Sequence, residues 1–136
     1  MNKEFVHSIK IYYEDTDSGG VVYYANYLKF LERARSEAIY SLDLSNKLLL
    51  DKHDMLIVVK TCNIDYKKPA KFEDNLKIIS IIKSINKASF VMKQTIKREN
   101  VTICDAEVRL AVVNKKGKPI RIPKILENRF KNFLSR

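Results

Sequence analysis

The chain has 136 residues, the usual length of one domain, and its 46% of apolar residues is enough for one hydrophobic core. No apolar run approaches the ~18 residues that a membrane-spanning helix needs, and residues 1–4 do not resemble the start of a signal peptide, so we expect a cytoplasmic protein. The formal net charge of +10 is uneven, because residues 1–54 have seven Lys/Arg against nine Asp/Glu, whereas residues 55–136 have nineteen against seven.

The first predicted elements are a strand and an acidic loop. Residues 4–13 alternate loosely and are rich in β-branched and aromatic side chains, which predicts a strand. Residues 14–20, EDTDSGG, combine acids, a serine and two glycines, which is typical of a loop.

From Tyr27 the apolar period becomes helical. Asn26 is a suitable N-cap, and apolar side chains then recur on one stripe of a helix of about four turns. The stripe contains Tyr27, Leu31, Ala34, Ala38 and Leu42. Residues 45–53 predict a short second helical segment.

Four further strands are predicted in the second half, because runs rich in β-branched residues alternate with turn residues. They cover residues 55–66, 75–85, 88–98 and 101–114. The links at 86–87 and 99–100 are short enough for hairpins, so the last three strands should be antiparallel neighbours. A short C-terminal helix is expected after Ile122-Pro123, since proline favours the first turn of a helix.

This order of elements predicts an α+β fold in a single domain over residues 1–136. One long helix cannot bury its apolar stripe alone, but a curved, five-stranded antiparallel sheet wrapped around it would do so. That arrangement is the hot-dog fold, here with a short C-terminal helix added.

The strand at residues 75–85 also predicts an oligomer. Its side chains are apolar on both faces, with Leu76, Ile78 and Ile82 on one and Ile79, Ile81 and Ile85 on the other. One helix covers only one face of the sheet, and large exposed apolar patches usually mark an interface. We therefore expect a homo-oligomer. It should be at least a dimer, and we predict a homotetramer built from two dimers.

The two cysteines, Cys62 and Cys104, both fall in predicted strands. No second Cys or His stands at the spacing of metal ligands, so we expect no metal site. A disulfide is disfavoured in a reducing compartment, and we predict two buried free thiols that pack as small apolar side chains.

The chemically informative segment is Tyr12–Tyr27, which holds three acids, two glycines and a helix N-terminus. A carboxylate can attack a carbonyl or activate water, and a helix N-terminus offers N–H groups to a developing oxyanion. Asp17 stands just before Gly19 and Gly20, which let the backbone turn tightly near a ligand. Acids, serine and glycine before a helix are also ordinary turn and capping residues, so both interpretations stand.

The stretch YYEDTDSGGVVYYANYLKFLERARSE, residues 12–37, resembles the 4-hydroxybenzoyl-CoA thioesterase family in its YbgC-like branch. Weaker likeness follows at residues 65–78, 89–90 and 117–123, so the resemblance covers nearly the whole chain in order. It implies the hot-dog fold and hydrolysis of an acyl-CoA to free acid and coenzyme A. It also implies no metal, no cofactor apart from the coenzyme A of the substrate, and dimers or tetramers with sites at the dimer interface.

The same resemblance assigns catalytic residues. The family's catalytic carboxylate, nucleophile or general base, lies two residues before the glycine pair, which is Asp17 here. Its oxyanion donors are backbone N–H groups at the start of the long helix, here near Tyr23 and Tyr24. The YbgC-like branch usually has histidine at the position of Tyr24, and tyrosine, with a reference pKa of ~10, is no base at neutral pH. We expect this change to affect rate and acyl preference more than reaction class.

The resemblance also implies where the substrate binds. Gly19 and Gly20 in the loop are expected to contact the substrate. The family binds the phosphates of coenzyme A elsewhere, around the hairpin before residues 89–90. The matching polar residues are Lys83, Lys87 and Ser89. A second candidate site for the phosphates is the basic patch formed by Lys67, Lys68 and Lys71.

Other acid–base residues are assigned structural roles. Asp15 is expected to act in the loop or as a cap. The two histidines, His7 and His53, lie outside the loop. Because hot-dog dehydratases use a histidine with an acid, this placement argues against dehydration.

The basic half leaves one alternative open, a non-catalytic binding module. Its partner would be acidic acyl carrier protein, envelope machinery or nucleic acid. No RNP-like aromatic motif or KH-type glycine loop supports nucleic acid. A composition rich in lysine, isoleucine and asparagine, as an AT-rich genome encodes, also explains the charge.

Overall fold

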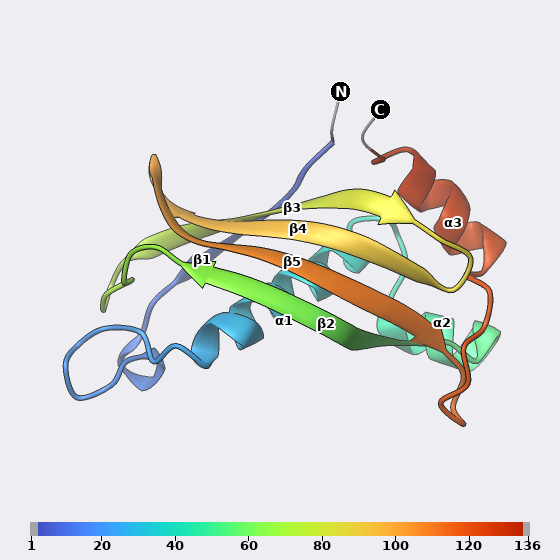
Figure 1. Ribbon diagram of the computed structural model, residues 1–136, viewed down its shortest axis with the longest axis horizontal. Helices are drawn as coiled ribbons and strands as arrows, with labels where there is room; N and C mark the ends of the chain where they lie inside the picture. Colours follow the sequence, from blue (N-terminus) through green and yellow to red (C-terminus); the bar gives the residue numbers. More distant parts are fainter. Residues whose placement is uncertain (1–2, 135–136) are drawn as a thin grey trace.

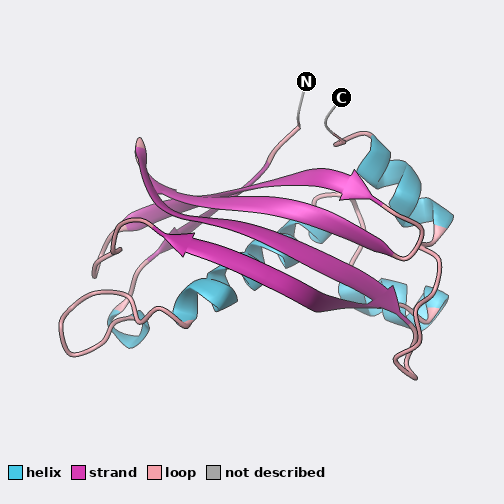
Figure 2. Cartoon of the chain, in the orientation of Figure 1, coloured by secondary structure: helices cyan, strands magenta, loops and turns pink. Residues whose placement is uncertain are grey.

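The structure is a computed structural model, and it describes residues 3–134. Within these residues the chain forms one sheet and three α-helices (Figures 1 and 2). The elements are β1 (Phe5–Lys10), the 3₁₀ turn η1 (Tyr13–Asp15), α1 (Asn26–Tyr40), α2 (Asn46–His53), β2 (Leu56–Tyr66), β3 (Asn75–Ile85), β4 (Ser89–Arg98), β5 (Val101–Val113) and α3 (Lys124–Lys131). The described part of the chain contains no helix that is long and apolar enough to cross a membrane.

The five strands form one sheet in the order β1-β3-β4-β5-β2, and every neighbouring pair is antiparallel. The predicted hairpins join β3 to β4 and β4 to β5, while β1 and β2 form the two edges. α1 lies along one face of the sheet, with α2 and α3 gathered at one end of it (Figure 1).

The predicted stripe of α1 is buried against this inner face. All five of its residues are in the core: Tyr27, Leu31, Ala34, Ala38 and Leu42. A polar cluster also lies beneath the helix. The fully buried side chain of Gln94 donates to the Leu31 carbonyl oxygen and to Ser80 Oγ, both at 3.0 Å, so no buried side-chain donor or acceptor is left unpaired among the described residues.

Two details at the start of the chain differ from the sequence prediction. The first strand is shorter than residues 4–13, because Tyr13–Asp15 form a 3₁₀ turn whose Tyr12 N–H donates to Asp15 Oδ2 at 2.9 Å. Asn26 is not the N-cap of α1 but its first residue, and Ala25 takes the cap position. The Asn26 side chain instead donates to the Asp15 carbonyl oxygen at 2.9 Å, which ties the helix to the loop before it.

β3 is less apolar on its outer face than the sequence predicted. The pairing with β4 shifts by one residue between Ile82 and Ser84, and this irregularity brings Ile85 to the same side as Ile82. Ile85 therefore packs against the core. Only Ile79 and Ile81 remain on the outer face, where both are half-buried.

Both cysteines are free thiols, as predicted. Cys104 is buried, and burial together with the neighbouring Asp105 raises the pKa of its thiol to about 12. Cys62, in contrast to the prediction, is only half-buried.

Candidate active site

Asp17 lies in a tight turn between β1 and α1. The Asp17 N–H donates to the Val21 carbonyl oxygen at 2.9 Å, and the Gly20 N–H donates back to the Asp17 carbonyl oxygen at 3.1 Å. One carboxylate oxygen, Oδ1, accepts from the Gly19 N–H at 2.8 Å. The residue is exposed, and no described residue donates a hydrogen bond to the other oxygen, Oδ2, which is therefore available to a ligand.

The two glycines fit this turn for different reasons. Gly20 has φ +81°, a conformation that other residues adopt only with strain. A Cβ on Gly19 would stand 3.2 Å from Asp17 Oδ1, closer than ordinary contact. Gly19 therefore leaves room for the carboxylate, and Gly20 permits the turn.

The segment 69–74, just before β3, holds this loop in place. Val22 N–H donates to the Ala70 carbonyl oxygen at 2.8 Å, and Phe72 N–H donates to the Gly20 carbonyl oxygen at 3.3 Å. The segment is itself fixed by Arg98, whose Nη1 donates to Asp74 Oδ2 at 2.7 Å. The loop that carries Asp17 is thus exposed but attached to the sheet at several points.

Buried Tyr27 supplies a further anchor for this segment. Its hydroxyl oxygen accepts from the Ala70 N–H at 3.0 Å. Burial raises the pKa of Tyr27, so it remains protonated at neutral pH. The first buried side chain of α1 therefore fixes the loop's support as well as the core.

The two predicted oxyanion positions are not equivalent. The Tyr23 N–H donates to the Asp15 carbonyl oxygen at 3.1 Å and is therefore occupied. The Tyr24 N–H has no acceptor within residues 3–134. Of the two, Tyr24 is the backbone donor at the start of α1 that remains available to a ligand.

An aromatic cluster covers the start of α1, and sequence reasoning missed one of its members. Tyr66, the last residue of β2, packs edge-on against Tyr24 with ring centroids 6.3 Å apart and lies 5.5 Å from Tyr27. Tyr23 packs on Tyr24 at 5.1 Å. Burial raises the pKa of Tyr66. Tyr66 falls in the weakly similar stretch 65–78 but was assigned no role there, since it approaches the loop only when β2 folds back along the sheet.

The structure does not bring the predicted phosphate ligands together with Asp17 in one chain. Lys87 and Ser89 lie at the β3–β4 turn, whereas the Asp17 loop is attached beside the start of β3, at the other end of the sheet (Figure 1). β3 has 11 residues and is about 33 Å long. Lys83 lies near the same turn, and its Nζ is paired with Glu107 Oε1 at 2.7 Å.

The second candidate phosphate site, the patch of Lys67, Lys68 and Lys71, lies nearer to the Asp17 loop. Lys71 pairs by a β-bridge with Val21, directly beside the Asp17 turn. Lys67 is paired with Asp65 at 3.1 Å, and both side chains are exposed. Asp15 is confirmed in its capping role, because it accepts the Tyr12 N–H.

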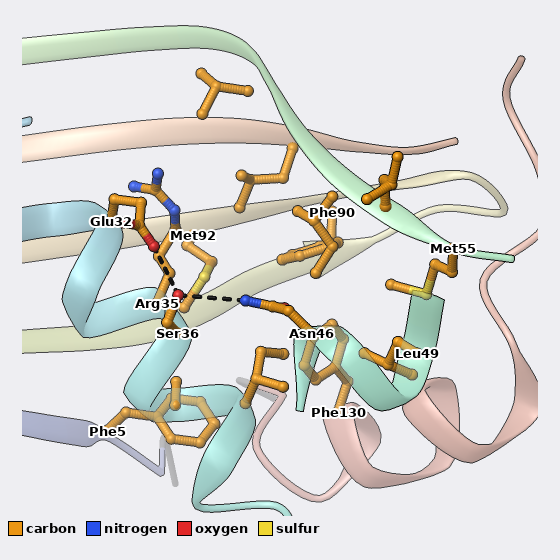
Figure 3. Close-up of a pocket in the computed structure, with 16 residues that line it drawn as sticks. Phe5, Glu32, Arg35, Ser36, Asn46, Leu49, Met55, Phe90, Met92 and Phe130 are labelled. Atoms are coloured by element: carbon orange, nitrogen blue, oxygen red, sulfur yellow. Dashed lines mark hydrogen bonds between the residues drawn. The ribbon is translucent and has the colours of Figure 1, made fainter. Parts of the chain in front are cut away.

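A pocket of about 310 Å³ opens at the opposite end, between α1, α2 and the edge strand β2 (Figure 3). Its deepest residues are apolar and nearly fully buried: Leu49, Met55, Phe90, Leu110 and Phe130. The sequence did not predict this pocket, because its lining comes from seven separate elements.

One wall of the pocket is polar. Ser36 Oγ donates to Glu32 Oε2 at 2.6 Å and accepts from Asn46 Nδ2 at 3.3 Å, which links α1 to α2. Arg35, beside them, donates to Gln94 Oε1 at 3.0 Å, and burial lowers its pKa. Among residues 3–134, no group of three or more His, Cys, Asp or Glu side chains is arranged to hold a metal ion.

The family model that matches this chain is that of the thioesterase superfamily, over residues 19–104. The chain belongs to the thioesterase superfamily. It is accordingly an enzyme, a thioester hydrolase, and the predicted family and hot-dog fold are confirmed.

Individual relatives match over most of their length. An acyl-CoA thioesterase YbgC of Haemophilus influenzae is 37% identical over 131 residues, with 96% of each chain covered. An acyl-CoA thioester hydrolase YbgC of Escherichia coli is 38% identical, with 90% of this chain and 92% of the relative covered. The crystal structure of a probable thioesterase from Bartonella henselae superposes with a TM-score of 0.86 at 34% identity, over 89% of this chain and all of the other.

Proposed function

We propose that this protein hydrolyses acyl-CoA thioesters and that Asp17 supplies the reacting carboxylate. The observation that carries the proposal is the loop geometry: a solvent-facing carboxylate oxygen in a turn attached to the sheet, followed by a helix start whose Tyr24 N–H is unused. The acyl-CoA substrates named for the relatives at 37–38% identity support the substrate class. No metal or other cofactor enters the proposal.

Two routes are open to the carboxylate. As a nucleophile, Asp17 attacks the thioester carbonyl carbon, the coenzyme A thiolate leaves, and water then hydrolyses the acyl–Asp17 anhydride. As a general base, Asp17 takes a proton from water as the water oxygen attacks the same carbon; the C–S bond then breaks, and the leaving coenzyme A thiolate takes the proton from Asp17. In both routes negative charge develops on the carbonyl oxygen, and the Tyr24 N–H at the positive end of the α1 dipole suits that charge.

Purified protein should release free thiol from at least one acyl-CoA in a series of short, long and aromatic acyl groups. The rate should be unaffected by EDTA, because no step uses a metal. Absence of thiol release from every member of the series would refute the proposed function.

We further propose that the working site forms between two chains. The Asp17 loop and the pocket lie at opposite ends of the molecule, at the Tyr66 end and the Leu56 end of β2 respectively. β2 is an edge strand. If two copies pair antiparallel through β2, each Leu56 end lies beside the other chain's Tyr66 end, and one chain's loop reaches the other's pocket and β3–β4 turn.

This pairing gives the β3–β4 turn a role that one chain alone does not allow. Lys87 and Ser89 would then approach the phosphates of a coenzyme A whose thioester lies at the other chain's Asp17. Light scattering at micromolar concentration should give at least twice the 15.9 kDa mass of the chain. A fully active monomer would refute the shared site. Pairing of two dimers through the outer sheet face, where Ile79 and Ile81 lie half-buried, would give the predicted homotetramer.

Acyl carrier protein remains a proposed partner, and the cytoplasm the proposed location. The exposed lysines of the turn after β5, Lys115, Lys116 and Lys118, offer positive charge to an acidic partner at the pocket end. Membership in a hydrolase family does not favour the purely non-catalytic module or nucleic-acid binding.

A further inference from the structure

The pocket at the α2 and α3 end has an open side and a closed side. Its exposed lining residues are Glu32 on α1, Asn46 on α2, and Leu56 and Val59 on β2. From β2 the lining continues inward across the sheet through Leu110 on β5 to Phe90 on β4, and these two are only 2% exposed. The pocket therefore opens at the sheet edge and ends in the protein interior.

α3 forms part of the closed end. Phe130 of α3 is 3% exposed and packs edge-on against Phe90, with ring centroids 4.9 Å apart. In Figure 3, Phe130, Leu49 and Met55 lie at one end of the pocket, while Glu32, Arg35 and Ser36 lie at the other. The two aromatic rings thus stand where the far end of a bound chain would arrive.

The polar side chains of the lining lie toward the open side, and each makes a hydrogen bond within the protein. Ser36 is hydrogen-bonded to both Glu32 and Asn46. Arg35 is hydrogen-bonded to Gln94. The deep residues Phe90, Leu110 and Phe130 provide no side-chain hydrogen-bonding group. A ligand that carries a hydroxyl or carboxylate at its far end would leave that group unpaired in an apolar environment, which is unfavourable.

From this arrangement we infer that the pocket receives an aliphatic acyl chain, and that Phe130, packed on Phe90, limits the length of chain that it accepts. The inference rests on the proposed function and on the proposed two-chain site, because the Asp17 loop of one chain meets the pocket of the other only in that pairing. A volume of about 310 Å³ is at the small end of ligand pockets (~300–1,000 Å³), which suits short to medium chains. Hydroxylated aromatic acyl groups are disfavoured by the apolar end.

Chain length should appear directly in the kinetics. Each methylene that moves from water onto the apolar wall should raise kcat/KM about fourfold until the chain reaches Phe130. Beyond that length, kcat/KM should level off or fall, because the closed end has no room for a further carbon.

The test compares wild-type protein with Phe130→Leu across straight-chain acyl-CoA substrates from acetyl to palmitoyl, with 4-hydroxybenzoyl-CoA included. Leu126→Val is the matched control, because Leu126 lies on the same helix α3 and is equally buried but does not line the pocket. Circular dichroism and thermal unfolding establish that each variant is folded. Should Phe130→Leu fail to fold, Phe130→Met replaces it.

The optimum of Phe130→Leu should move to longer chains, with kcat/KM for the first chain beyond the wild-type optimum raised about fourfold or more. Leu126→Val should keep the wild-type optimum. An unchanged length profile in folded Phe130→Leu, or a wild-type preference for 4-hydroxybenzoyl-CoA over every aliphatic substrate, would overturn the inference.

A binding measurement separates this inference from the proposed function. Free fatty acids from butyrate to laurate should raise the wild-type unfolding temperature in a length-dependent way, and the preferred length should increase in Phe130→Leu. If no acyl-CoA is hydrolysed but this pattern is seen, the proposed function fails and the pocket assignment stands. If hydrolysis is seen but no fatty acid changes the unfolding temperature, the pocket assignment fails.

Discussion

Two turns at opposite ends of the molecule (Figure 1), residues 17–21 and 114–118, share three hydrogen bonds, and the second turn has one more, from the Lys118 N–H to Asn114 Oδ1 at 3.0 Å. In each, the side chain of the first residue accepts a backbone N–H two residues later: Asp17 from Gly19 at 2.8 Å and Asn114 from Lys116 at 3.0 Å. In each, the fourth residue is a glycine with φ +81° whose N–H donates to the first residue's carbonyl oxygen.

The surroundings of the two turns differ. Residues 17–21 lead to the start of α1, with its unused Tyr24 N–H and the cluster of tyrosines beside it. Residues 114–118 follow β5 toward α3, and the first residue there is an uncharged asparagine. The comparison shows that the turn alone explains the conformation of Asp17, and that any chemistry must come from its charge and its neighbours.

The largest loss of activity is expected when Asp17 is replaced by asparagine, the residue at the same position of the second turn. Asp17→Asn keeps the acceptor for the Gly19 N–H but removes the negative charge, so kcat should fall by about 10²–10⁴. The free energy of unfolding should change by less than about 0.5 kcal/mol, because the turn is preserved. Steady-state kinetics and urea unfolding measure the two quantities.

The reverse change provides the control. Asn114→Asp places a carboxylate in the other turn and keeps the side-chain oxygen that accepts the Lys116 N–H. It should leave kcat unchanged. An Asp17→Asn variant with near wild-type kcat would assign Asp17 a purely structural role.

A smaller effect is expected from the two glycines. A Cβ at Gly20 or at Gly117 meets no atom within 4 Å, so alanine introduces only backbone strain at either position. Each variant should lose about 1 kcal/mol of unfolding free energy. Only Gly20→Ala should also lower kcat, about 10- to 100-fold, because it displaces the carboxylate.

Equal losses of kcat in Gly20→Ala and Gly117→Ala would show that activity follows general stability. Unequal losses of stability would show that the two turns are not energetically equivalent. Both comparisons use the same chemical denaturation and the same acyl-CoA substrate.

Most of the fold was predictable because its patterns are local. The stripe of α1 and the alternation of β5 from Cys104 to Val112 are periodicities that appear in the sequence itself, and both are buried as expected. The errors occurred where one contact overrides a pattern. Ile85 faces the core and not the outer side of the sheet, because the pairing of β3 with β4 shifts before it. The Asn26 side chain donates to the Asp15 carbonyl oxygen and so does not cap α1.

The candidate site was predictable only in its loop. Asp17, Gly19 and Gly20 are adjacent in sequence, so a motif could mark them. Tyr66 and the pocket residues meet only through the sheet topology, and no short stretch of sequence contains them together. Lys87 and Ser89 were assigned to the same site as Asp17, yet the length of β3 separates them within one chain.

The free edge of β2 has a consequence for how a single chain behaves. β2 has 11 residues, exposed Leu56, Val58 and Val59, and one edge that pairs with no strand in this chain, so it is a template for another extended chain and a starting point for aggregation. A shift in the pairing with β5 at Lys60, with its exposed charge, is the strand's main interruption. The proposed pairing of two copies through β2 would cover this edge, so a low expression temperature, which slows aggregation through unfolded segments, should raise the yield of folded protein.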